Sequence, residues 1–116
     1  MKRNMELIKA ILFELEEDSL SFTSEPLQEW NAEEVAYHRG LILNADLAEG
    51  NDLSTLGDED YSLSRLTSKG HDFVDAARNQ SVWASAKSKV LKVGGSVSLS
   101  VFQELLKQSL LQELGL

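Results

Sequence analysis

The sequence predicts a mainly helical protein that contains one small β-hairpin. Within the expected strand 61–66, Tyr61, Leu63 and Arg65 alternate with serine, which is typical of a strand whose two faces differ. The chain has 116 residues, of which 42% are hydrophobic, and this is enough for one small domain with a single core. Apolar residues recur at helical spacing in five segments, near residues 4–17, 31–45, 67–77, 82–93 and 98–114.

The first helix is expected over residues 4–17. Leu7 and Phe13 lie off its main apolar stripe, which indicates that the helix is covered on more than one side. Residues 19–23 alternate apolar and hydroxyl side chains and predict a short strand. The main stripe consists of Met5, Ile8, Ile11, Leu12 and Leu15.

The central helix has a strong start signal. Asn31 is a good N-cap residue, because its side-chain oxygen can accept a hydrogen bond from an amide of the first turn. Glu34 stands where its carboxylate can reach back to the cap amide and complete a capping box. The apolar stripe that follows consists of Val35, His38, Ile42 and Ala45.

Three residues in or near the helices have both a structural and a functional interpretation. Gly40 costs a helix interior about 1 kcal/mol relative to alanine. It indicates either close packing of a backbone or a large ring, which we favour, or a surface that a partner approaches closely. His38 is expected to be a hydrogen-bonded core residue rather than a ligand or a base, and His71 receives the same interpretation.

A hairpin is expected to join residues 47–49 to residues 61–66 through a loop rich in glycine and acidic residues. Thr67 then caps the next helix. Helix, strand, loop, strand and helix, in this order, form the back half of a winged helix-turn-helix. We therefore expect a single winged-helix-like domain with its core over residues 1–79 and the hairpin near 47–66.

Two further helices are expected in a C-terminal extension over residues 80–116. Ser81 can cap a helix over 82–93, which Gly94 and Gly95 would end. The last helix, over 98–114, has a broad apolar face that must fold back on its own domain or pair with a second subunit. We expect leucines left over from the packing to support a weak homodimer. The packing line is expected to be Phe102, Leu106 and Leu110.

Several short motifs occur together in an order that resembles a known family. They are residues 1–8 (MKRNMELI), 34–38 (EVAYH), 66–73 (LTSKGHDF) and 94–97 (GGSV). This pattern is similar to an uncharacterised bacterial and prophage family, domain of unknown function 2513. The resemblance covers nearly the whole chain. It implies a winged-helix-like fold and a bacterial or phage setting, but no activity.

The central helix departs from the pattern of that family at three positions. Arg39, Gly40 and Asp46 stand where an apolar residue, a helix former and a glycine would be more usual. These departures speak against an ordinary DNA-recognition helix.

Composition and missing motifs point away from an enzyme. The chain has no cysteine, which removes thiolate metal sites and thiol nucleophiles, and its two histidines are few for a zinc site. No glycine-rich phosphate loop and no serine elbow occurs. We expect no enzymatic activity, no cofactor and no metal. Without an apolar run of 18 residues or a secretory leader, the protein is expected in the cytoplasm and not in a membrane.

The charge distribution is more informative than the net charge of −8. Residues 1–60 carry 4 Lys/Arg and 15 Asp/Glu, whereas residues 61–116 carry 7 and 4. Proteins that bind duplex DNA gain much affinity from Lys and Arg on phosphates, so an acidic wing opposes DNA docking. The acidic surface consists of Glu49, Asp52, Asp58, Glu59 and Asp60, and the one basic cluster of Arg78, Lys87, Lys89 and Lys92.

Two functional hypotheses follow from this distribution. The first is a regulatory or protein-interaction module whose acidic wing meets a basic protein partner. The second is a DNA-binding transcriptional regulator that contacts phosphate through the basic cluster. The first is favoured, because the charge of the wing is a physical argument, whereas a fold shared with transcription factors is only an association.

Overall fold

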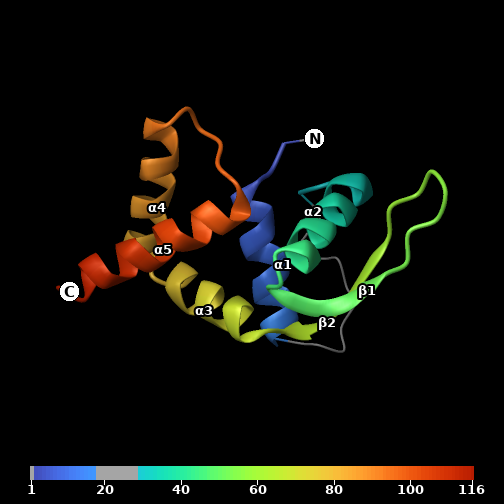
Figure 1. Cartoon of the computed structure of the whole chain (residues 1–116), viewed down its shortest axis with the longest axis horizontal. Coiled ribbons are helices and arrows are strands. Elements are labelled where there is room, and N and C mark those ends of the chain that lie inside the picture. The colour runs from blue at the N-terminus through green and yellow to red at the C-terminus, as the bar shows by residue number, and fades with distance from the viewer. Residues whose placement is uncertain (1, 18–28) are drawn as a thin grey trace. The chain divides into compact units, whose positions relative to one another are not determined.

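The structure is a computed structural model that describes residues 2–17 and 29–116 (Figure 1). It confirms a mainly helical protein with one antiparallel hairpin. The strand expected over residues 19–23 lies outside the described residues. In chain order the elements are α1 (Met5–Glu17), α2 (Ala32–Asn44), β1 (Ala48–Asp52), β2 (Tyr61–Leu66), α3 (Ser68–Ala77), α4 (Gln80–Lys92) and α5 (Leu99–Glu113).

The chain forms two compact units, Met1–His71 and Asp72–Leu116. The first contains α1, α2, the hairpin and the first turn of α3, and the second contains the rest of α3 with α4 and α5. Compact units need not fold separately, so the expected single domain over residues 1–116 stays a prediction.

In the first unit, α1 contacts α2 and β2, and α2 contacts both strands. The side chain of Asn4 starts α1, because its Oδ1 accepts from the amides of Glu6 and Leu7 at 3.0 and 3.3 Å. Leu7 is buried although it lies off the main stripe, which confirms that α1 is covered on more than one side. The buried side chains of this unit include Leu7, Ile8, Ile11, Leu12, Val35, His38, Ile42, Leu47, Leu63 and Leu66.

Both start signals of α2 are confirmed. Asn31 Oδ1 accepts from the Glu34 amide at 2.9 Å, and the Glu34 carboxylate accepts from the Asn31 amide. His38, one turn further on, is buried and hydrogen-bonded, as predicted. Its Nε2 accepts from the Asn4 amide at 2.8 Å, so Nδ1 carries the proton and donates to the Glu34 carbonyl at 2.7 Å. One neutral imidazole thus ties the start of α1 to α2.

The matching prediction for His71 is wrong, because this side chain is exposed. Its neighbour Gly70 faces inward, where a Cβ atom would lie 1.9 Å from the carbonyl oxygen of Leu47. The next residue of a helix is turned by roughly 100°, so His71 points to solvent.

Close packing explains Gly40. A Cβ atom at this position would lie 2.8 Å from two ring atoms of Tyr61, at the start of β2. The ring therefore occupies the space that a side chain would need. Of the two interpretations given to Gly40, the structure supports the packing of a large ring.

The hairpin contains a β-bulge that the sequence did not predict. Glu49 pairs with Arg65, but Gly50 pairs with Leu63, so Ser64 is the extra residue on β2. The alternation expected for residues 61–65 is therefore wrong at Arg65. Leu63 and Leu66 are both buried, and Arg65 is exposed.

The corner between α2 and β1 is closed by the first turn of α3. Asp46 adopts a left-handed conformation with φ 61°, and its carbonyl accepts from Thr67 Oγ1 at 2.6 Å. The Thr67 amide donates to the Leu47 carbonyl at 3.1 Å. Thr67 also caps α3, as predicted, because its Oγ1 accepts from the Gly70 amide at 3.1 Å.

In the second unit, α4 begins earlier than predicted. Asn79 is the N-cap, and its side chain accepts from the amides of Ser81 and Val82 at 3.0 and 3.2 Å. The prediction that Ser81 caps this helix is wrong, because Asn79 is an equally good cap residue that reaches both free amides. Ser98 caps α5, a role that was not predicted for this residue.

An aromatic cluster forms the core of the second unit. The ring of Phe102 lies with its centroid 6.1 Å from that of Phe73 and 5.2 Å from that of Trp83. Phe102 and Leu106 are buried, which confirms this part of the expected packing line, whereas Leu110 is half-buried.

The first prediction concerns the aromatic cluster. Phe102→Ala removes a fully buried ring from between two other rings and should lower the free energy of unfolding by ~3–5 kcal/mol. Urea unfolding followed by circular dichroism measures the loss. Val101→Ala on the exposed side of α5 is the matched control. Equal stability of both variants would show that the cluster does not support the fold.

The second prediction concerns the corner at Asp46. Asp46→Gly should raise the free energy of unfolding by ~0.5–1 kcal/mol, because glycine adopts a positive φ without the steric cost of a Cβ atom. Asp72→Gly, at an exposed position of α3, should instead lower it. Thermal melts of the two variants compare the signs, and a lower melting temperature for Asp46→Gly would contradict the expectation.

Candidate functional site: an acidic hairpin and the hollow beside it

The loop between β1 and β2 is the free end of the hairpin (Figure 1). It is held by its own hydrogen bonds. Asp52 Oδ1 accepts from the Ser54 amide at 2.9 Å, and Ser54 Oγ accepts from the Asp60 amide at 3.0 Å. At the tip, Thr55 and Asp58 exchange backbone hydrogen bonds of 2.9 and 3.0 Å. The loop therefore presents its side chains on a defined backbone.

The structure brings four of the five predicted acidic residues together on this loop and separates the fifth from them. Asp52, Asp58, Glu59 and Asp60 belong to the loop or its edge, and all are exposed. Glu49 lies on the strand and accepts from Arg65 Nε at 2.5 Å and from Arg65 Nη2 at 3.2 Å. Because Arg65 balances its charge, Glu49 contributes little to the acidic surface.

Two of these carboxyl groups have shifted pKa values. The hydrogen bond and the charge of Arg65 lower the pKa of Glu49 below its ordinary value. Hydrogen bonds from Ser54 lower the pKa of Asp52. Both groups are therefore ionised at neutral pH, as an acidic surface requires.

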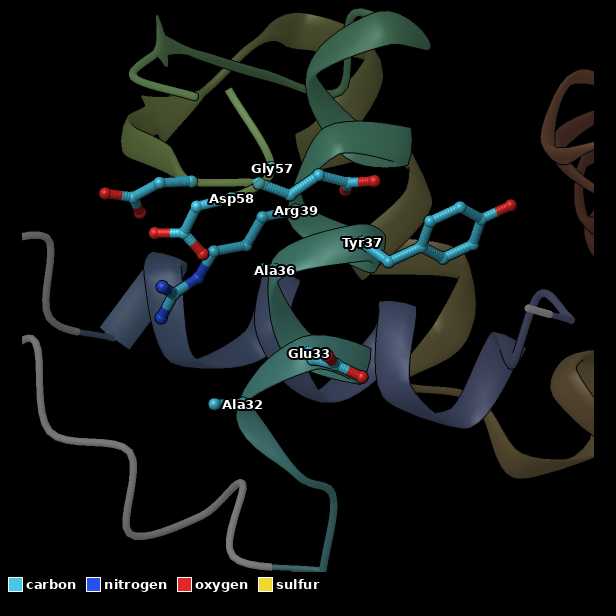
Figure 2. Close-up of a pocket in the computed structure, with 9 residues that line it drawn as sticks. Ala32, Glu33, Ala36, Tyr37, Arg39, Gly57 and Asp58 are labelled. Atoms are coloured by element: carbon cyan, nitrogen blue, oxygen red, sulfur yellow. The ribbon is translucent and has the colours of Figure 1, made fainter. Parts of the chain in front are cut away.

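A hollow of about 630 Å³ lies between α2 and the loop, within the first unit. Four carboxylates and one guanidinium line it, which leaves an excess of negative charge. Figure 2 shows the side chains of Arg39 and Asp58 extending to the same side, whereas Tyr37 extends away from them. The lining residues are Ala32, Glu33, Ala36, Tyr37, Arg39, Gly57, Asp58, Glu59 and Asp60.

Arg39 also influences α1. Burial raises the pKa of Glu14, and the positive charge of Arg39 acts in the opposite direction. Oε2 of Glu14 is buried and has no hydrogen-bond partner among the described residues. Arg39 therefore lines the hollow and also acts on a carboxylate of α1.

The four predicted basic residues do not form one face. Lys87 and Lys89 are two positions apart on α4 and lie roughly 160° apart around its axis. Lys89 donates to Ser109 Oγ and Gln112 Oε1 on α5, each at 3.2 Å, so its ammonium joins two helices. Arg78 pairs with Asp75 at 3.6 Å, and Lys92 is exposed.

Sequence reasoning missed two leucines in the acidic loop. Leu56 is fully exposed, and Leu53 is 53% exposed. The signal was present, because large apolar residues are unusual in a stretch of glycine, serine and acids. The hollow itself had no sequence signal, since α2 and the loop meet only in the folded chain.

Residues 2–17 and 29–116 contain neither a metal-binding cluster nor a membrane-spanning helix. Within these ranges, no group of three or more His, Cys, Asp or Glu side chains is arranged to hold a metal ion. The helices described there are all too short or too polar to cross a bilayer.

The sequence comparison supports the resemblance noted from the motifs. A model of the family described as "Hypothetical protein (DUF2513)" matches residues 2–96. The chain belongs to this family. A relative from Haemophilus influenzae, described as an uncharacterized protein, is 32% identical over 118 residues, which cover 99% of this chain and 100% of the relative. No solved structure matches. The family gives no activity, so the function of the chain is unknown and has to be argued from its surface.

The third prediction concerns the ion pair on the hairpin. In Arg65→Ala, the pKa of Glu49 should rise towards its ordinary value, because the variant removes the charge and the hydrogen bonds that lower it. Carboxyl ¹³C chemical shifts measured against pH give both pKa values. Asp52 is the internal control, since its pKa is lowered by Ser54 and should not change. A Glu49 pKa that stays low in the variant would rule out Arg65 as the cause.

Proposed function

We propose that this protein is a non-enzymatic, winged-helix-like module that acts in the bacterial cytoplasm by binding a basic protein partner. The acidic surface, defined here as Asp52, Asp58, Glu59 and Asp60, is the contact region. The order α2, β1, β2 and α3 matches the second half of a winged helix-turn-helix and supports the fold assignment. A regulatory role fits a small module that binds a protein without transforming a substrate.

One observation carries the proposal. Residues 58–60 of the acidic surface line the hollow together with Glu33 and Arg39, so carboxylates outnumber cations there. Asp52 is exposed at the edge of the same loop. Carboxylates on an ordered loop attract Lys and Arg from a distance and repel phosphate. They therefore favour a basic partner over nucleic acid at this surface.

The contacts that the basic residues make within the second unit weaken the DNA-binding alternative. Of its four proposed cations, Lys89 is bound to α5 and Arg78 is paired with Asp75. Lys87 and Lys89 lie on different sides of α4. This arrangement weakens a phosphate contact through all four residues together. The weak homodimer remains a secondary proposal, supported by the exposure of Leu111 on α5 and of Leu114 at its C-cap.

The fourth prediction separates the two kinds of partner. At physiological salt, the protein should bind duplex DNA of mixed sequence no more tightly than about 10⁻⁴ M, the weak end of non-specific binding. A fluorescent oligolysine peptide should bind more tightly, because its charge is opposite to that of the loop. Fluorescence anisotropy measures both dissociation constants.

Charge reversals supply the controls. The triple change Asp58→Lys, Glu59→Lys and Asp60→Lys should weaken oligolysine binding about tenfold or more. The same reversal at Asp72, Glu104 and Glu113, which are exposed in the second unit, should have a smaller effect. Equal losses would show that net charge alone acts. A micromolar DNA complex that is lost in Lys92→Glu would favour the alternative.

A further inference from the structure

The two loop leucines are not accounted for by the charge of the acidic surface. Leu53 and Leu56 expose apolar side chains in the same loop that carries the acidic surface. The backbone around them is hydrogen-bonded, since the Leu53 amide donates to the Asp60 carbonyl at 2.8 Å and Thr55 is paired with Asp58. Neither leucine packs in the core, so the fold does not explain why they are leucine.

Single exposed leucines are ordinary on protein surfaces, but this arrangement resembles an interface. Protein contacts combine an apolar centre, which provides most of the affinity, with a polar rim that sets orientation and specificity. In such a contact, the exposed Leu53 and Leu56 would supply the apolar centre, and the exposed carboxylates of Asp52 and residues 58–60 the rim. The rim residues 58–60 also line the hollow beside α2, so the charged surface is continuous with it.

We propose that Leu53 and Leu56 are an apolar anchor for a protein partner that presents an apolar surface edged by lysine or arginine. This inference rests on the proposed function and adds the apolar half of the contact. Charge complementarity favours such a basic protein over other molecules that could bind at this surface. A second copy of the hairpin would bring like charges together, and an anionic membrane or a nucleic acid would be repelled by the same carboxylates.

The test compares two peptides of equal length and charge. One is oligolysine extended with serine, and the other is an amphipathic peptide of leucine and lysine. The wild-type protein should bind the leucine–lysine peptide about tenfold or more tightly than the lysine–serine peptide, because burial of leucine adds to the attraction of charges. Fluorescence anisotropy at physiological salt gives both dissociation constants.

The double variant Leu53→Ser and Leu56→Ser should remove this preference and leave binding of the lysine–serine peptide unchanged. Both side chains are exposed, so the variant should melt at the wild-type temperature. The matched control is Leu91→Ser with Leu116→Ser, two leucines that are 74% and 84% exposed in the second unit. The control should keep the preference.

Three other results would overturn the inference, and each has a different meaning. Equal binding of both peptides, or a preference that survives in Leu53→Ser with Leu56→Ser, would show that charge acts without the leucines, and the proposed function would stand alone. If the control variant lost its preference for the leucine–lysine peptide to the same extent, the preference would come from general apolar adsorption and not from Leu53 and Leu56. If neither peptide bound, both the inference and the proposed function would fail.

Discussion

The corner at Leu47 is the constraint on which the first unit depends. The carbonyl of Leu47 accepts from the Thr67 amide, and Gly70 packs so closely on the same carbonyl that no side chain fits there. Leu47 precedes β1 and Thr67 follows β2, so this contact closes the hairpin at its base. The base in turn fixes where the loop lies beside α2, and with it the hollow.

The β-bulge determines which charges remain available on the hairpin. An extra residue at Ser64 places Arg65 opposite Glu49, where the two side chains pair. Without the bulge, Arg65 would lie on the same face as the buried Leu63. The ion pair removes one acid from the surface and leaves the negative charge concentrated in the loop. Backbone register thus shapes the electrostatics of the candidate site.

Local signals predicted the elements of the fold well. The capping residues Asn31 and Thr67 act on amides within their own helix, so short stretches of sequence were sufficient to identify them. The error at the start of α4 comes from competition between neighbouring cap residues. Asn79 and Ser81 are both good caps, and only the packed chain shows which one begins α4.

The candidate site was harder to predict than the fold. The acidic residues are adjacent in sequence and were found, but their environment depends on long-range contacts. Arg65 meets Glu49 across 16 positions, and the hollow needs α2 as its second wall. For the expected basic cluster, nearness in sequence was misleading. Its residues are close in sequence, but α4 distributes them around its axis, and Lys89 is engaged by α5.

The charge of the first unit has a kinetic consequence. Residues 1–71 contain 6 Lys/Arg and 15 Asp/Glu, a net charge of −9. A field of this sign accelerates the approach of a positively charged molecule, and dissolved salt screens it over ~10 Å or less. Association with such a molecule would therefore slow as ionic strength rises. Dissociation would depend mainly on short-range contacts, and a loop that is already ordered adds little delay to either step.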